Sequence, residues 1–193
     1  MNELLDQTRA HLDGEPCRPS VFPHPIAFNL FCHDSAVGDD GYNAEERKLI
    51  DETRKIMHDP DLAIAPTCVR VPVLRAHSES INLEFDDPVN PDALRDVLQS
   101  APGVKIVDDR NAGRFPMPID ATGADAVLVG RIRSDVSRPD GRGIELFICG
   151  DQLRKGAALN ALQIAEHLTA ADFQPRPPVA QRFPAATSAQ QAV

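Results

Sequence analysis

Apolar and polar positions along the chain predict a series of short helices and strands. Residues 2–12 have a helical period, with Leu4, Leu5, Thr8 and Leu12 on one face. A second helix is predicted to begin after Asn43, because Asn43 and Glu46 have the spacing of an N-cap with its capping box. It should end near Met57, because Asp59-Pro60 stops it. Its apolar stripe consists of Leu49, Ile50, Thr53, Ile56 and Met57.

The rest of the chain predicts strands joined by turns, with two further helices. Alternation over residues 80–85 is typical of a half-buried strand. Asp140-Gly141 is a strong turn signal between two apolar runs, which predicts a long hairpin. The predicted strands are residues 67–73, 80–85, 104–107, 126–132 and 144–149, and the further helices are residues 91–100 and 151–168.

This order of elements indicates an α+β fold, because the strands follow one another through antiparallel links instead of repeating a βαβ unit. Four prolines between residues 13 and 25 favour an extended stretch there. The segment 170–193 is rich in Pro, Gln, Ala and Ser, and we expect it to be a disordered tail.

Composition narrows the class of protein. The 193 residues are 42% hydrophobic and 25% charged, which is ordinary for a globular protein, and the net charge of −9 disfavours non-specific nucleic-acid binding. No apolar run has the roughly 20 residues that a membrane span needs, and the first helix is too polar for a signal peptide. We expect a soluble, cytoplasmic protein whose four cysteines, Cys17, Cys32, Cys68 and Cys149, are reduced.

Two pairs of residues are candidates for chemistry. Arg70 and His77 would suit a site that grips a carboxylate and moves a proton, but they share a face only if Pro72 breaks the strand; a charged strand edge is the alternative. Glu52 and Lys55 lie three apart on a helix, where they either form a solvent-exposed ion pair or line a small-molecule pocket.

Other candidates are weaker. Asp151 can cap the last helix, whose N–H groups either make a modest anion site or simply begin the helix. His24, Cys32, His33 and Asp34 lack the spacing of a metal site, so no metal is expected. The nearest match to a glycine-rich phosphate loop, residues 141–143, lacks a third glycine and lies in the predicted hairpin.

With these segments in view, the chain resembles the C-terminal half of the aspartate-β-semialdehyde dehydrogenases. The resemblance runs in order over almost all of residues 1–168, and the segments that end at Ser78 and begin at Gly150 are specific in combination. The matching segments are residues 3–9, Phe22-Pro-His-Pro-Ile-Ala-Phe-Asn29, Glu52-Thr-Arg-Lys55, Cys68-Val-Arg-Val-Pro-Val-Leu-Arg-Ala-His-Ser78, Gly130-Arg-Ile-Arg133 and Gly150-Asp-Gln-Leu-Arg-Lys-Gly-Ala-Ala-Leu-Asn160.

The resemblance implies an α+β substrate-binding and dimerisation domain over residues 1–149, with a mixed, largely antiparallel sheet and helices on one face. Residues 150–168 would pack on the NADP-binding domain. His77 matches the family's general acid/base and Arg70 the group that holds the substrate carboxylate. The remaining matches are Glu52 with the substrate-amine contact, Lys55 with the phosphate contact, Gln152 with an NADP contact and Pro25 with a backbone position near the nicotinamide.

The resemblance also implies what is missing. The family's catalytic cysteine and its glycine-rich NADP loop lie upstream of the matched region, so we expect this chain to be inactive alone. It would form a homodimer and work with a separate N-terminal half. Two alternatives stay open: a non-catalytic dimerisation or regulatory partner of a full-length dehydrogenase, and a fragment of a sister N-acetylglutamyl-phosphate reductase. Glu52 argues against the reductase, because an acetylated amine has no charge to neutralise it.

Overall fold

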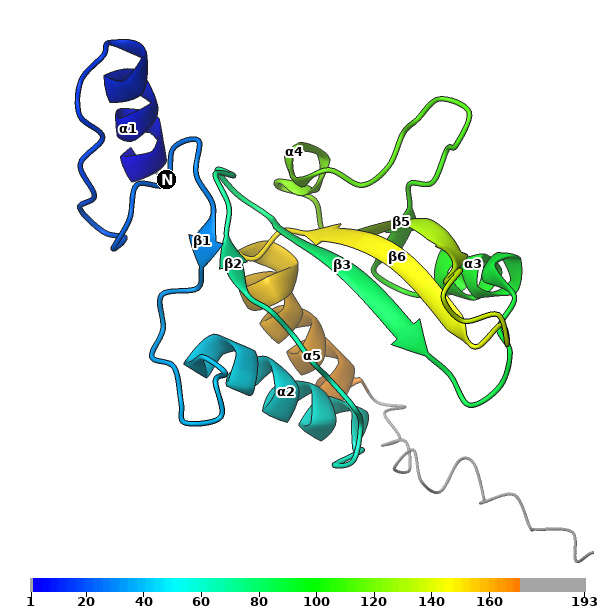
Figure 1. The fold of residues 1–193 in the computed structure, drawn as a ribbon. Coiled ribbons are helices and arrows are strands. Elements are labelled where there is room, and N and C mark those ends of the chain that lie inside the picture. Colours follow the sequence, from blue (N-terminus) through cyan, green and yellow to red (C-terminus); the bar gives the residue numbers. More distant parts are fainter. Residues whose placement is uncertain (1, 171–193) are drawn as a thin grey trace, which may run out of the picture. The chain divides into compact units, whose positions relative to one another are not determined.

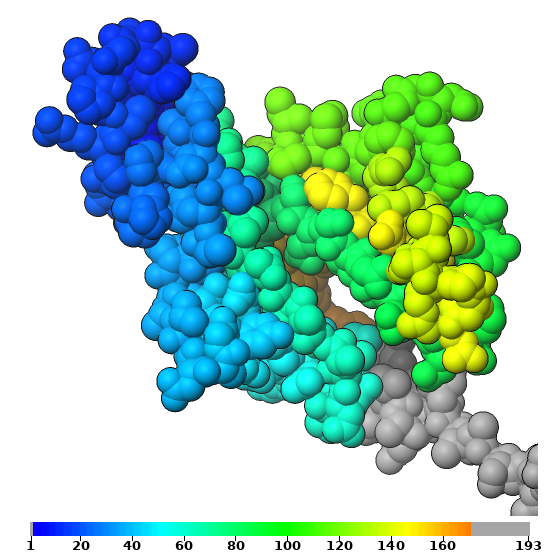
Figure 2. Space-filling model, viewed as in Figure 1, coloured from blue at the N-terminus to red at the C-terminus, as the bar shows by residue number. Residues whose placement is uncertain are grey.

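A computed structural model describes residues 2–170, which divide into two compact units (Figure 1). The first unit covers residues 2–72 and the second covers residues 73–170. Figure 2 shows the surface of the first unit in blue to cyan and that of the second in green to orange. The predicted disordered tail lies outside the described residues, apart from residue 170. Within residues 2–170 no helix has the length and apolar character to span a membrane.

The first unit consists of two helices and a small antiparallel sheet. The predicted bounds of both helices are confirmed, whereas the strand predicted over residues 67–73 is only two residues long. In the sheet, Phe31 lies opposite Arg70. The elements are α1 (Asn2–Leu12), β1 (Phe31–Cys32), α2 (Ala44–Met57) and β2 (Val69–Arg70).

Helix α1 is held by polar contacts and not by its predicted apolar face. The Glu3 carboxylate accepts hydrogen bonds of 2.8 Å from the amides of Ser20 and Val21, and the Gln7 side-chain oxygen accepts one of 2.8 Å from the Ile26 amide. Glu3 and Gln7 are buried, whereas Leu12 is 75% exposed. The helix therefore fixes the proline-rich segment that follows it.

The start of α2 is the predicted capping box. The Asn43 side chain accepts from the Glu46 amide, and the Glu46 carboxylate accepts from the Asn43 amide, both at 2.9 Å. The second oxygen of Glu46 accepts from the amide of Cys68 at 2.9 Å. One buried carboxylate thus ties the start of α2 to the residue before β2.

The second unit is built on one four-stranded sheet in the order β3-β6-β5-β4. β4 runs parallel to β5, and the other two pairings are antiparallel, which confirms the predicted α+β fold with a mixed, largely antiparallel sheet. The elements are β3 (His77–Glu84), α3 (Pro91–Ser100), β4 (Val104–Ile106), α4 (Pro118–Ala121), β5 (Val127–Ser134), β6 (Gly143–Gly150), the π-helical turn η1 (Arg154–Ala158) and α5 (Leu159–Thr169).

The two faces of the sheet have separate apolar clusters. Leu94 and Leu98 of α3 pack with Ile132 and Ile144 on one face. Ala121 of α4 packs with Leu128, Cys149 and their neighbours in the second cluster. Successive strand residues point to opposite faces, so Leu128 and Val129 belong to different clusters. α3 is therefore the helix that covers one face of the sheet, as predicted. α4, which contacts the second cluster, has four residues and is too short to show a helical period in the sequence.

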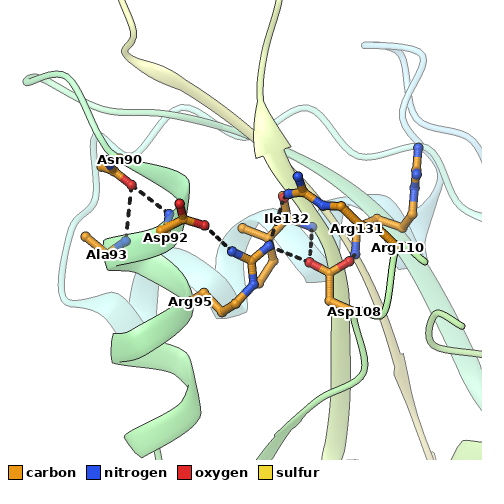
Figure 3. A network of polar contacts seen from close by, with 8 residues as sticks. All are labelled: Asn90, Asp92, Ala93, Arg95, Asp108, Arg110, Arg131 and Ile132. Carbon is orange, nitrogen blue, oxygen red and sulfur yellow. Dashed lines mark hydrogen bonds and ion pairs between the residues drawn. The ribbon is translucent and has the colours of Figure 1, made fainter. Parts of the chain in front are cut away.

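A bulge interrupts the pairing of β5 with β6 between Gly130 and Arg133, and Arg131 has a positive φ of 54°. The Asp108 carboxylate accepts from the amides of Arg131 and Ile132 at 2.9 and 3.3 Å (Figure 3). The bulge is thus stabilised by Asp108, which lies two residues after the end of β4.

Candidate functional site

Arg70 lies at the end of β2 and has a fixed orientation. Its Nε donates to the Asp34 carboxylate at 3.0 Å, and its guanidinium carbon lies 5.3 Å from the centre of the Phe22 ring. The pKa of Asp34 is lowered by its own backbone amide and by Arg70. Within residues 2–170 the two terminal nitrogens of Arg70 have no hydrogen-bond partner, so they can still receive a carboxylate.

Glu52 and Lys55 are exposed on α2, and the ion pair that their spacing allowed is not formed. Neither side chain has a partner in the described part of the chain. On the same helix, by contrast, Lys48 donates to Glu45 at 3.3 Å. The two charges of Glu52 and Lys55 are therefore available to a charged ligand.

Pro25 is held in place by neighbouring groups. Its carbonyl accepts from the Asn29 side chain at 2.8 Å, and the amides of Ile26 and Ala27 donate to the buried Gln7 side chain at 2.8 and 3.2 Å. Pro25 is the last residue of the stretch that the prolines predicted to be extended, and this stretch contains no helix or strand.

His77 is the first residue of β3 and pairs with Gly150. β2 ends at Arg70 and β3 begins at His77, so no strand continues through Pro72. The His77 side chain is exposed, and its ring has no partner among residues 2–170. The imidazole is thus free to exchange a proton with a ligand.

Gln152 is hydrogen-bonded to the backbone of Ala76, the residue before His77. Its side-chain oxygen accepts from the amide of Ala76 at 2.7 Å. Ala76 is buried and has a positive φ of 80°. Because an amide N–H must meet an acceptor, this bond fixes which end of the Gln152 side chain is oxygen, and its NH₂ group stays available.

Asp151 is fully buried and accepts four hydrogen bonds. One oxygen accepts from Gly123 N at 2.6 Å and from Arg75 Nη2 at 2.7 Å; the other accepts from Leu153 N and Arg154 N at 2.9 and 3.1 Å. Burial acts to raise its pKa, but these donors outweigh burial and hold the pKa well below its usual range. Asp151 therefore caps the turn before η1 and occupies the N–H groups that an anion would have used. The helix predicted over residues 151–168 is instead the π-helical turn η1 followed by α5, and neither has a side-chain hydrogen bond at its own N-cap residue.

The sequence profile of the family described as "Semialdehyde dehydrogenase, dimerisation domain" matches residues 1–155. The chain belongs to this family. Since the match covers the segments that carry Glu52, Lys55, Arg70 and His77, the resemblance seen in the sequence is confirmed.

Relatives of known name agree with this assignment. The aspartate-semialdehyde dehydrogenase of Prochlorococcus marinus is 53% identical over 168 residues, which are 87% of this chain and 48% of that protein. Aspartate semialdehyde dehydrogenase II of Vibrio cholerae, solved in complex with ASA, is 40% identical, with a TM-score of 0.82 over 89% of this chain and 50% of that chain. The Candida albicans enzyme solved with NADP has a TM-score of 0.58 at 23% identity and shows the shared fold.

The chain spans about half the length of the curated relatives that it matches, and it corresponds to their C-terminal part. The site residues that the family resemblance predicted are divided between the two compact units. Pro25, Glu52, Lys55 and Arg70 belong to the first unit, and His77 and Gln152 belong to the second. The sequence did not predict the ion pair of Asp151 with Arg75, because no local pattern links residues 76 positions apart.

Cys149 and the glycines between β5 and β6 have structural roles in the second unit. Cys149 is buried, its Sγ lies 3.3 Å from the Ser78 hydroxyl, and burial raises the pKa of its thiol, so it is a poor nucleophile. Gly141 and Gly143 lie where β5 turns into β6, which is no phosphate loop. Among residues 2–170, no three His, Cys, Asp or Glu side chains are grouped to hold a metal ion. Of Pro25 and Gln152, the two residues that the sequence predicted to contact NADP, Gln152 has an NH₂ group without a hydrogen-bond partner among residues 2–170.

Proposed function

We propose that this chain is the substrate-binding and dimerisation part of an NADP-dependent aspartate-semialdehyde dehydrogenase. Such an enzyme interconverts L-aspartyl 4-phosphate and L-aspartate 4-semialdehyde in the biosynthesis of lysine, methionine and threonine. The observation that carries the proposal is the 53% identity to the Prochlorococcus enzyme over 87% of this chain. The unpartnered charges of Glu52 and Lys55 support it, because a ligand with both an ammonium and a phosphate needs both signs.

Each binding group has a chemical role in this proposal. The terminal nitrogens of Arg70 hold the α-carboxylate of the substrate, since a guanidinium matches a carboxylate in a bidentate way. Glu52 contacts the substrate ammonium, and Lys55 contacts the phosphate. Asp34 keeps the Arg70 guanidinium oriented through its Nε while the other donors stay free.

His77 acts as the general acid and base. In the phosphorylating direction the imidazole takes the thiol proton as the thiol adds to the aldehyde carbon and gives it to the oxygen of the resulting adduct. It takes the proton back from that hydroxyl as the carbon is oxidised, and releases it to solvent. None of the four cysteines of this chain has the sequence setting of the nucleophile, so that cysteine comes from the NADP-binding half. NADP, held mainly by that half, supplies or accepts the hydride, and Gln152 contributes an amide N–H to it.

Complementation tests the proposal. The 193-residue chain alone should reduce no NADP in the presence of semialdehyde and phosphate. Adding the separately expressed NADP-binding half of the Prochlorococcus enzyme should restore turnover. Substituting His77→Asn should then lower kcat by about 10²–10⁴-fold, the usual contribution of an acid/base group. Turnover by the chain alone, or none after complementation, would contradict the proposal.

A pair of lysine variants tests the phosphate contact. Lys55→Ala should raise the KM for phosphate by about ten-fold or more, because a charge-assisted contact is lost. Lys48→Ala is the matched control on the same helix, since Lys48 already pairs with Glu45. Equal effects of both variants on the KM would remove Lys55 from the phosphate site.

The dimerisation domain also supports a homodimer, which sedimentation of the purified chain measures directly. A chain that binds a full-length dehydrogenase and changes its rate, but restores no turnover with the NADP-binding half, would instead be a regulatory partner. Substrate choice in the complemented enzyme separates the aspartate enzyme from the N-acetylglutamyl-phosphate reductase. Only a free ammonium gives the unpaired Glu52 a partner.

A further inference from the structure

Three segments that are distant in the sequence, residues 75–76, 123 and 151–152, meet directly before His77. Arg75 pairs through its side chain with Asp151, and the Ala76 amide donates to the Gln152 side chain, both at 2.7 Å. The Gly123 amide donates to the same oxygen of Asp151 at 2.6 Å. β3 begins directly after these contacts, at His77, which pairs with Gly150.

The backbone at this point needs such contacts. Ala76 has a φ of 80°, which side chains with a Cβ rarely adopt, and it is buried in the cluster with Ala121 and Leu128. An unfavourable conformation persists only where the surroundings fix it. The Gln152 oxygen is the acceptor for the Ala76 amide, so it bonds the strained residue itself.

The backbone of His77 is held in the sheet, whereas its ring is exposed. The ring has no hydrogen-bond partner within residues 2–170. The Nε of Arg75 is buried without a partner in the same region, so Asp151 is the group that holds this guanidinium. The arrangement fixes where His77 starts and leaves its imidazole free, as an acid/base group requires.

We propose that Asp151 and Gln152 are positioning residues for His77: through Arg75 and Ala76 they fix the backbone that carries the imidazole. This goes beyond the NADP contact that the family resemblance gives to Gln152, because it uses the oxygen and not the NH₂ group of the side chain. The catalytic meaning of the clamp rests on the proposed function, whereas its structural action on His77 does not.

Variants of Gln152 test the clamp in the 193-residue chain. Gln152→Met keeps the length of the side chain and removes the acceptor, and Gln152→Glu keeps an acceptor oxygen. NMR should show that hydrogen exchange of the Ala76 amide rises about ten-fold or more in Gln152→Met and returns close to wild type in Gln152→Glu, with amides of Val129 and Leu146 unchanged. The backbone order of His77 should fall and recover in parallel.

A second glutamine provides the matched control. Gln163 is half-buried, as Gln152 is, and accepts from Lys155 at 2.7 Å. Gln163→Ala should leave the Ala76 amide and His77 unchanged. Unchanged exchange at Ala76 in Gln152→Met, or no recovery in Gln152→Glu, would overturn the proposal. Asp151→Asn is a supplementary variant, because it weakens four contacts at once and so lowers the stability of the chain as well as the fixation of His77.

The catalytic arm uses the complemented enzyme. At saturating NADP, Gln152→Met should lower kcat about ten-fold while the KM for semialdehyde changes little, and Gln152→Glu should restore kcat. Both variants remove the NH₂ group, so loss of an NADP contact should raise the KM for NADP in both and does not account for a difference in kcat between them. A loss that Gln152→Glu does not restore would assign Gln152 to NADP contact alone. If the wild-type complement is inactive, the proposed function fails, while the NMR result still decides the clamp.

Discussion

Arg95 of α3 donates from Nη2 to the Asp108 carboxylate at 2.7 Å, and the Asp108 side chain is only 1% exposed (Figure 3). The same carboxylate accepts the amides of Arg131 and Ile132 at the bulge of β5. Burial acts to raise the pKa of Asp108, but Arg95 and the two amides outweigh it, and the pKa is lowered. One buried charge therefore joins α3 to the irregular part of the sheet.

Asp108→Asn should lower the free energy of unfolding by about 2–4 kcal/mol, because Arg95 loses its buried counter-charge and one of the bulge amides loses an acceptor. Chemical denaturation of the purified chain measures this change. Asp92→Asn is the control, since Asp92 pairs with the same arginine but its side chain is 86% exposed, and it should change stability by less than about 0.5 kcal/mol. Equal losses in the two variants would show that burial of Asp108 is unimportant.

Gly130→Ala should be strongly destabilising. A Cβ at this position would overlap the carbonyl oxygen of Val107 and lie 2.6 Å from Cδ of Pro116, so the backbone of β5 must move. We expect a loss of about 2–3 kcal/mol, as for other overpacked core positions. In Gly150→Ala the nearest atom is Val127 Cγ2 at 3.7 Å, an ordinary contact, so thermal denaturation should show little change. A Gly130→Ala protein as stable as wild type would contradict the prediction, because it would show that the backbone at the bulge shifts at no cost to make room for the Cβ.

The sequence predicted the features whose causes are local. The capping box at Asn43 and Glu46 placed α2 correctly, because a cap acts within three residues. The bulge at Arg131 and the ion pair of Arg75 with Asp151 depend on contacts between distant segments, so no pattern announced them. The face of α1 was mistaken for the same reason: its partners are backbone amides 17–19 residues away.

The site residues were named through the family resemblance and not through spacing. Spacing alone left a Glu52–Lys55 ion pair as an alternative, and the described structure does not contain it. It also could not show that the Gln152 oxygen binds the Ala76 amide, since that bond joins residues 76 positions apart.

Helix α5 leaves apolar side chains exposed, and the family resemblance predicts that this helix packs on the NADP-binding half. Leu162, Ile164 and Leu168 are 56%, 53% and 58% exposed. Changing all three to Gln should raise about ten-fold the concentration of NADP-binding half that is needed to restore turnover, because apolar burial at the interface is lost. Melting of the chain alone should change little. Glu166→Gln, on the same helix, is the control; unaltered complementation by the triple variant would move the interface elsewhere.

Asp151 should make stability depend on pH in the acid range. Its pKa is lowered in the folded chain, so the unfolded chain binds the proton more readily, and the stabilisation is complete above the unfolded pKa of about 3.9. It is lost as the pH falls through the folded pKa. The difference in melting temperature between wild type and Asp151→Asn should therefore be largest at pH 5–7 and should shrink steadily as the pH falls below about 4. Carboxylates common to both proteins cancel in the comparison. A difference that stays constant down to pH 2.5 would show that the charge of Asp151 contributes nothing and that shape alone matters.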